Sequence, residues 1–397
     1  MTRPLGLPPA QPSRLLHTST PLPHCPCMPR SLGEVHQVPL TLINAGEGRV
    51  HPVYVDKEPR STPFEARSQR AKRTPRSHDI YANATLLHDA LAHLHTYALS
   101  RHDYLASIQI MVDPLTSGQA LQECVSSGTS LAHKFIMNAH DKECIVRWEW
   151  RKRIWLFALP PCSGFILTNL LSEPPPPRLL RFAQTNGGVD LILLDPPWPN
   201  RSAQRAWQGR QSVRRYRTMD DIYDLWLLRP WMEALLQQHT LVAVWVTNHP
   251  KVQDFVRSKW FPGLGLRHHA TWAWLKLTAP NGQAPQLLIP VGDWSFRRPY
   301  EVLLIGSRQD EAPVSRHHLL LSVPLGHSCK PNVCSVLRPQ GGRVVELFAR
   351  HVSRGAPWHV SVGDEAICGN AQGYDDTTTA MGSQSRAQNS YADVCLS

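Results

Sequence analysis

Six short apolar runs, separated by longer segments, follow Pro161 in this 397-residue chain. Each run is apolar on both faces rather than alternating, as is typical of strands in a sheet covered on both sides by helices. Two intervening segments, 219–238 and 332–340, have the pattern of crossover helices. The sequence therefore predicts an α/β fold with a doubly wound, mostly parallel sheet. The predicted strands are 164–170, 189–195, 241–247, 270–277, 300–306 and 343–349.

The predicted strand 189–195 ends on an unusual tetrad, Asp195-Pro196-Pro197-Trp198. Doubly wound sheets bind ligands at the carboxyl ends of their strands, so we expect Asp195 to lie in the ligand crevice. The two prolines fix φ and lack a backbone N–H, so we expect an extended chain whose carbonyls point outward without partners. Trp198 would add a flat face on which a base stacks.

A carboxylate, a rigid carbonyl and an aromatic face suit a planar heterocycle that carries an amino group. The N6 nitrogen of adenine is a poor nucleophile because its lone pair is delocalised into the ring. If Asp195 and the Pro196 carbonyl each accept one N–H, the nitrogen becomes pyramidal and its lone pair points at an electrophile. The sequence thus predicts Asp195, Pro196, Pro197 and Trp198 as catalytic residues. A strand-ending turn stiffened by proline is the simpler alternative.

The tetrad resembles the catalytic motif of the eukaryotic adenine/adenosine N6-methyltransferases, and ordered blocks extend the resemblance over about 160–366. Ala349 and the Pro-Tyr-Glu strand are most similar to the branch of methyltransferase-like protein 4. The blocks that carry the resemblance are "WVTN" (245–248), "WAWLK" (272–276), "RPYEVLLIG" (298–306), "HSCKP" (327–331), "ELFAR" (346–350) and "WHVSVGDE" (358–365).

The resemblance implies S-adenosylmethionine as the methyl donor. It also implies a Rossmann-like methyltransferase sheet with permuted motif order, since the acceptor motif precedes the cofactor loop. Glu346 and Asp364 would accept from ribose hydroxyls, while Lys330 and Arg350 would meet the methionine carboxylate or order those acids. The implied donor pocket consists of Asn169, Leu170, Asp195, Lys330, Glu346, Phe348, Arg350, Asp364 and Glu365.

Two positions depart from the family pattern that the resemblance implies. Asn169 stands where the family usually has Asp, so it keeps an acceptor oxygen but loses a charge. Asp364 replaces the usual Asn of the closing block. These departures leave open a catalytically silent nucleic-acid-binding scaffold of the same fold, although such partners typically lose the tetrad that is intact here.

A formal net charge of +11 favours an anionic partner, most commonly nucleic acid. The segment 199–219 follows the tetrad with six arginines and no acid, so we expect a substrate-contacting loop or, alternatively, a solvated one. The first predicted substrate is RNA, and the resemblance suggests small nuclear RNA as its class. DNA is the alternative. The predicted substrate-binding residues are Trp198, Asn200, Arg214, Arg215, Tyr216, Arg217 and Asn248.

Changes in composition and hydrophobic periodicity along the sequence predict four parts with different roles. They are a disordered, basic, Pro-rich arm (1–79), an accessory or substrate region (80–158), the S-adenosylmethionine-dependent domain (159–367) and a flexible tail (368–397). Within the second part, a helix is expected over 82–99, with Asn83 as its cap, and the Trp- and Arg-rich stretch 144–161 suits either nucleic-acid contact or an edge strand.

The basic cluster 67–76 favours the nucleus. An acid-free N-terminus with Arg and Ser leaves the mitochondrion open, and the cytosol is a further alternative. Nine scattered cysteines lack ligand spacing, so we expect no metal site. No apolar run approaches the length of a membrane helix, so we expect no membrane partner.

Overall fold

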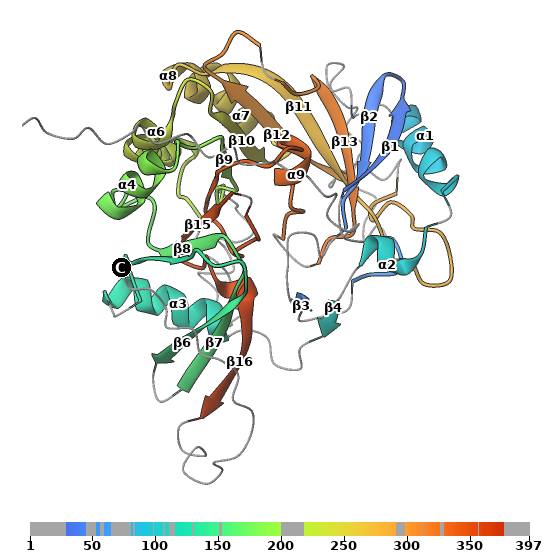
Figure 1. The fold of residues 1–397 in the computed structure, drawn as a ribbon. Coiled ribbons are helices and arrows are strands. Elements are labelled where there is room, and N and C mark those ends of the chain that lie inside the picture. Colours follow the sequence, from blue (N-terminus) through green and yellow to red (C-terminus); the bar gives the residue numbers. More distant parts are fainter. Residues whose placement is uncertain are drawn as a thin grey trace, which may run out of the picture.

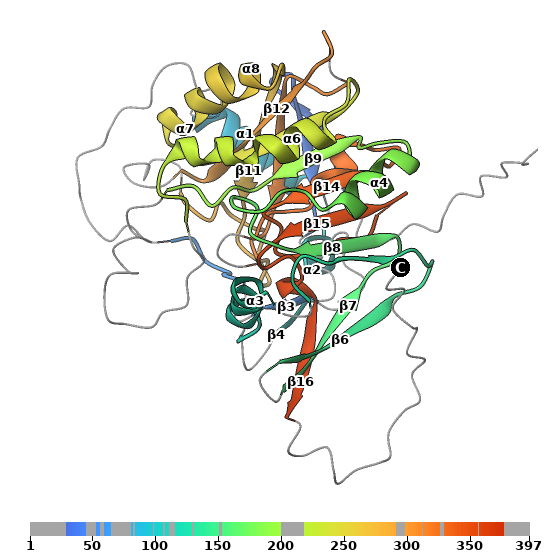
Figure 2. The same ribbon diagram turned by 90° about the vertical axis from the view of Figure 1, so that its left-hand side faces the viewer.

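The computed structural model contains an eleven-stranded sheet with helices on both faces (Figures 1 and 2). Within the described residues its strand order is β1-β2-β13-β11-β12-β10-β9-β14-β15-β8-β5. The structure describes residues 29–44, 53–55, 59–64, 81, 84–97, 99–105, 108–110, 116–128, 131–150, 153–199, 218–290, 298–311, 313–325, 329–355 and 357–376.

Five adjacent parallel strands form the centre of the sheet. In spatial order they are β10 (Leu241–Val246), β9 (Leu191–Leu194), β14 (Val344–Leu347), β15 (His359–Gly363) and β8 (Ser163–Leu167). Four of them coincide with predicted apolar runs. The fifth, β15, was not predicted as a strand because its buried residues include a histidine and a serine.

The sheet is mixed rather than parallel throughout, because β12 (Tyr300–Ser307) runs antiparallel to both of its neighbours. These neighbours are β10 and β11 (Arg267–Lys276). Next to β11 lies a further parallel strand, β13 (His317–Ser322). The reversal of β12 brings its amino end to the edge at which the parallel strands have their carboxyl ends.

Part of the predicted disordered arm belongs to the sheet. Strands β1 (Arg30–Val35) and β2 (Val38–Leu42) form a hairpin, and β2 pairs in parallel with β13. Helix α1 (Ala84–His95) lies against β1 (Figure 1). The expectation of disorder over 1–79 is therefore wrong for residues 30–42. The hydrophobic side chains of this hairpin alternate with polar ones over too few residues to be recognised within a proline-rich segment.

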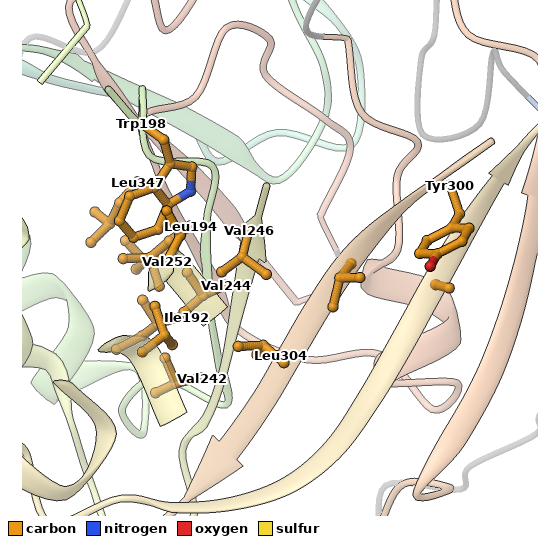
Figure 3. Close-up of a cluster of buried hydrophobic side chains, with 14 of the residues drawn as sticks. Ile192, Leu194, Trp198, Val242, Val244, Val246, Val252, Tyr300, Leu304 and Leu347 are labelled. Carbon is orange, nitrogen blue, oxygen red and sulfur yellow. The ribbon is translucent and has the colours of Figure 1, made fainter. Parts of the chain in front are cut away.

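Helices cover the two faces of the central strands unequally. Those on one face are α4 (Pro177–Thr185), the 3-10 helix η2 (Ile222–Leu228), α6 (Arg229–Leu235), α7 (Pro250–Phe255), the π-helix η3 (Val256–Trp260) and α8 (Phe261–Gly263). Helix α9 (Cys334–Leu337) packs on the other face. Since strand residues alternate between faces, Ile192 and Leu194 point to the first cluster, shown in Figure 3, while Leu191 and Leu193 point to the second.

A second, three-stranded sheet lies beside the first. It consists of β6 (Cys144–Trp150), β7 (Arg153–Leu159) and β16 (Ala371–Asp376), with α3 (Thr116–Ser127) packed on it. Trp148 and Trp155 are 3% and 4% exposed in the shared core, so these tryptophans belong to the buried face of a hairpin. The predicted flexible tail is ordered over 371–376, because these residues pair with β7.

Small elements complete the described structure. They are α2 (Arg101–Tyr104), the parallel pair β3 (Val53–Val55) and β4 (Ile108–Ile110), the edge strand β5 (Phe135–Asn138) and the 3-10 helix η4 (Cys368–Asn370). None of the described helices is long and apolar enough to cross a membrane. In the same residues, no cluster of three potential metal ligands occurs. The predicted domain limits stay predictions.

The hairpin of β1 and β2 gives a direct test of the fold. Leu40 is fully buried, so Leu40→Ala should lower the free energy of unfolding by about 2–4 kcal/mol in urea denaturation. Glu34→Ala, on the exposed side of β1, is the matched control and should change it by less than about 0.5 kcal/mol. Equal effects of the two substitutions would contradict the placement of the hairpin in the core.

Candidate active site

The carboxyl ends of the five parallel strands bring predicted site residues to one edge of the sheet. Asn169 follows β8, Asp364 follows β15, Phe348 follows β14, Asp195 follows β9 and Asn248 follows β10, each within two residues of its strand. The backbone N–H of Asp195 still donates to the Leu347 carbonyl at 3.3 Å, so pairing with β14 holds the acid at the strand tip. The structure thus places these residues together, while their roles remain predictions.

Asp195 is one member of a chain of alternating charges. The Lys330 Nζ lies 2.9 Å from Oδ1 and 3.0 Å from Oδ2 of Asp195. The same Nζ lies 3.3 Å from Oε2 of Glu301, whose other oxygen pairs with Lys276. Lys330 was predicted to meet the donor carboxylate or to order Glu346 and Asp364. The acids that it pairs with in the structure are Asp195 and Glu301, and its role towards the donor stays a prediction.

Burial makes these charges depend on one another. Burial alone would raise the pKa of Glu301, but Lys330 and Lys276 together lower it to about 2. Burial would likewise lower the pKa of Lys330, yet Asp195 and Glu301 raise it above its ordinary value. Glu301 therefore remains a carboxylate and Lys330 a cation across the physiological pH range.

Asp195 responds differently to the same surroundings. Burial raises its pKa, Lys330 acts against this, and the neighbouring carboxylates Glu301 and Glu346 add to the increase. The net pKa of Asp195 lies above its ordinary value. Lys330 thus keeps the buried acid available as a hydrogen-bond acceptor, and loss of that cation would favour the protonated form.

The carbonyls of the tetrad are not without partners, in contrast to our expectation. The Trp198 N–H donates to the Pro196 carbonyl at 2.8 Å, and the Met219 N–H donates to the Pro197 carbonyl at 2.8 Å. The Trp198 N–H, the next one along the chain, closes a tight turn, whereas the Met219 N–H comes from a residue far along the chain. A carbonyl oxygen has a second lone pair, which leaves Pro196 able to accept one further hydrogen bond.

Trp198 lies in the core rather than in the crevice. It is 6% exposed, and its indole Nε1 donates to the Trp245 carbonyl at 2.8 Å. Figure 3 shows the ring beside Leu194 and Leu347. The prediction that Trp198 offers an open stacking face is wrong, because burial of a large apolar ring with its N–H satisfied is the more stable arrangement. The side chain anchors the turn that carries Asp195.

One further ion pair and one side-chain hydrogen bond involve predicted donor residues. The Arg350 Nε is 2.6 Å from Oε2 of Glu365, whose side chain is 8% exposed. Burial opposes the charge of Arg350, but Glu365 outweighs it and raises the arginine pKa. On β14, Glu346 Oε2 is 3.1 Å from the Nε2 of buried His359.

The remaining donor residues have local structural roles. The Asn169 side-chain oxygen accepts from the Leu171 N–H at 3.1 Å and shapes the turn after β8. Leu170 is buried, whereas Asp364 is partly buried in the turn after β15. Phe348 has a φ of +61°, so the chain turns sharply as it leaves β14.

The predicted substrate residues divide into two groups. The Asn248 Nδ2 donates to the Tyr300 carbonyl at 2.6 Å, which ties the tip of β10 to the start of β12. Asn200, Arg214, Arg215, Tyr216 and Arg217 lie outside the described residues, so their role stays a prediction.

Glu301 and Lys276 were not predicted as site residues, although both occur in the blocks that carry the family resemblance. Lys276 ends β11 and Glu301 is the second residue of β12. The two strands are antiparallel neighbours with Trp274 opposite Glu301, and this register joins the two residues at the edge. A charged residue at the end of an otherwise apolar run was the available signal.

Lys330 compensates two buried acids, so its removal should be costly. We expect Lys330→Met to lower the free energy of unfolding at neutral pH by about 2–4 kcal/mol, below a fully buried pair because each partner keeps some solvent exposure. The loss should shrink in acid, where the stranded carboxylates protonate. Urea denaturation measures both effects, with exposed Lys251→Met as the control. A loss no larger than that of the control would contradict the charge chain.

Comparison with known proteins places this edge in a family. Residues 189–365 match the MT-A70 family model. The N6-methyladenosine RNA methyltransferase MTA1 of Pyricularia oryzae is 36% identical over 186 residues, which cover 43% of this chain and 46% of that protein. The N(6)-adenine-specific methyltransferase METTL4 of Homo sapiens is 30% identical over 227 residues, covering 53% and 43%.

A third relative, the DNA N6-methyl methyltransferase of Caenorhabditis elegans, is 28% identical over 171 residues and covers 41% of this chain and 42% of that protein. The chain thus spans less than half the length of each of these three relatives. The family match includes Asp195, Glu301, Lys330 and Glu365, whereas β8 and Asn169 precede it. Residues 189–365 therefore form an MT-A70 family domain.

Proposed function

We propose that the chain is an S-adenosylmethionine-dependent N6-methyltransferase that acts on adenine in nucleic acid. The observation that carries the proposal is the Asp195 carboxylate, held by Lys330 at the tip of β9 inside the MT-A70 domain. The names of three relatives support it, since all three are named N6 methyltransferases and two of the names specify adenosine or adenine.

The residues at the strand tips fit the donor. Asp195, Glu301 and Glu346 are three acids whose charges interact, with Lys330 and Lys276 as the paired cations. Burial is the main cause of the raised pKa of Asp195, and a donor with a sulfonium charge would relieve the repulsion from Glu301 and Glu346 that adds to it. Glu346 and Asp364 supply acceptors for ribose hydroxyls at neighbouring strand ends. Bound S-adenosylmethionine would supply an electrophilic methyl group.

The chain's own contribution to the reaction is to hold and orient the amino group. Asp195 accepts one N–H of the adenine amino group, and the second lone pair of the Pro196 carbonyl accepts the other. Both acceptors are rigid, because Lys330 holds the carboxylate and the Trp198 turn holds the carbonyl. Transfer of the methyl group from sulfur to nitrogen would leave the donor as a neutral thioether, and solvent would take up the proton that the nitrogen loses.

RNA is the substrate we propose first, with small nuclear RNA as the candidate class. The support is the relative MTA1, which is named an RNA methyltransferase and is 36% identical over the matched region. The relative named a DNA methyltransferase makes DNA the alternative. We also propose a nuclear location, on the basis of the basic cluster 67–76, which lies outside the described residues.

Methyl transfer from a labelled donor to total RNA and to genomic DNA, followed by identification of the labelled nucleoside, tests the proposal. We expect label in N6-methylated adenosine of RNA. Asp195→Ala should reduce kcat about 10²–10³-fold, as for the loss of one transition-state hydrogen bond. Asp195→Asn keeps the shape and one acceptor oxygen, so it controls for packing. Donor binding without transfer to either nucleic acid would instead indicate a catalytically silent scaffold.

The pH dependence of transfer should report Asp195. Because the pKa of Asp195 is raised, kcat/KM should fall in acid at a pH above about 3.9, the ordinary pKa of aspartate. The reason is that a protonated carboxyl group is a weaker acceptor for the adenine N–H than a carboxylate. Glu301→Gln removes a charge that raises this pKa, so its acid limb should move to lower pH. A limb that moves to higher pH, or does not move, would contradict the assignment of the limb to Asp195.

A further inference from the structure

Helix α3 reaches the predicted donor residues from outside the MT-A70 domain. The Gln122 Nε2 on α3 donates to Oε1 of Glu365 at 3.1 Å. The other oxygen of Glu365 pairs with the Arg350 Nε at 2.6 Å. Glu365 is thus held from two sides, by one residue of the family domain and by one residue of the preceding accessory region.

The position of α3 is set by a separate hydrophobic core. Leu121, Cys124 and Val125 on the helix pack in the same cluster as Trp155 and Ile367. Ile367 lies two residues after Glu365, so this cluster holds the helix against the turn that carries the acid. Gln122 follows Leu121 directly and therefore points to Glu365 from a rigid support.

We propose that Gln122 is a positioning residue for the donor site, and that the accessory unit formed by α3, β6, β7 and β16 acts on the methyl donor through the Gln122–Glu365–Arg350 chain. This inference rests on the proposed function, because it assumes that Glu365 and Arg350 lie beside the donor. It assigns a donor-side role to a region whose sequence suggested a substrate role.

The carboxylate of Glu365 is enclosed by protein. The Glu365 side chain is 8% exposed, so an oxygen that loses its partner is poorly compensated by water. Without Gln122, the carboxylate would rotate towards solvent and move the guanidinium of Arg350 with it. Donor affinity should fall, while the apolar face of α3 still packs.

Donor binding by the purified full chain without nucleic acid, measured by isothermal titration calorimetry, tests the proposal. Gln122→Ala should raise the dissociation constant about tenfold, as expected for a lost hydrogen bond to a charged group. Ser126→Ala is the matched control, since Ser126 is exposed one turn further along α3, and it should leave the constant unchanged.

Gln122→Glu separates positioning from mere support of the helix. At about pH 8, two carboxylates at hydrogen-bond distance repel, so donor binding should weaken by more than about tenfold relative to the unsubstituted chain. At about pH 6, one shared proton would let the new side chain donate to Glu365 as Gln122 does, and binding should recover to within about threefold. Arg350 is the charged partner of Glu365 at both pH values, because it stays protonated throughout this range.

The outcomes distinguish the two claims. If the unsubstituted chain binds no donor, the proposed function fails and the inference fails with it. If the unsubstituted chain binds donor and both Gln122 variants bind equally well, only the inference fails. A loss of affinity in Gln122→Glu that is the same at both pH values, with a matching loss of thermal stability, would show that Gln122 only supports α3 and would overturn its positioning role.

Discussion

The contact of Lys330 with Asp195 and Glu301 is the interaction on which the geometry of the strand tips depends. Two acids at this depth repel each other, and burial adds to the cost of both charges. One ammonium group between them offsets both effects and fixes where the carboxylates point. Asp195, which is proposed to act, and Glu301, which shares its cation, are therefore parts of one electrostatic unit, with Lys276 as its outer end.

That unit requires the reversed direction of β12. In a fully parallel sheet, the residue after Tyr300 would follow a strand start at the opposite edge, far from Asp195. Because β12 is antiparallel to β10 and β11, Glu301 instead meets the carboxyl ends of the other strands. The Asn248 Nδ2 donates to the Tyr300 carbonyl at 2.6 Å and so holds the end of β10 to the start of β12. The mixed topology is thus a condition of the site rather than a detail of the sheet.

The sequence predicted four of the five central strands because their apolar runs bury both faces, and it predicted polar residues at the tips of these four. It did not reveal that Trp198 is buried, since an aromatic residue after a strand suits a stacking face or a core position equally well. Nor did it pair Gln122 with Glu365, because 243 residues separate them and their contact depends on the packing of α3. Periodicity reports burial within an element, whereas such contacts arise from how elements meet.

Burial of Trp198 changes the role that this residue can have in the tetrad, from stacking on a base to fixing the turn. A ring exposed for stacking would leave the Pro-Pro turn held only by its own torsions. The buried indole instead bonds to the carbonyl of Trp245 on β10, while the N–H of Trp198 closes the turn onto Pro196. The tips of β9 and β10 are thereby joined through one side chain. Since acceptors aid a reaction most when they need no reorganisation, the tryptophan supports Asp195 and the Pro196 carbonyl by fixing their separation. Under the proposed function, the base would then stack on a different surface.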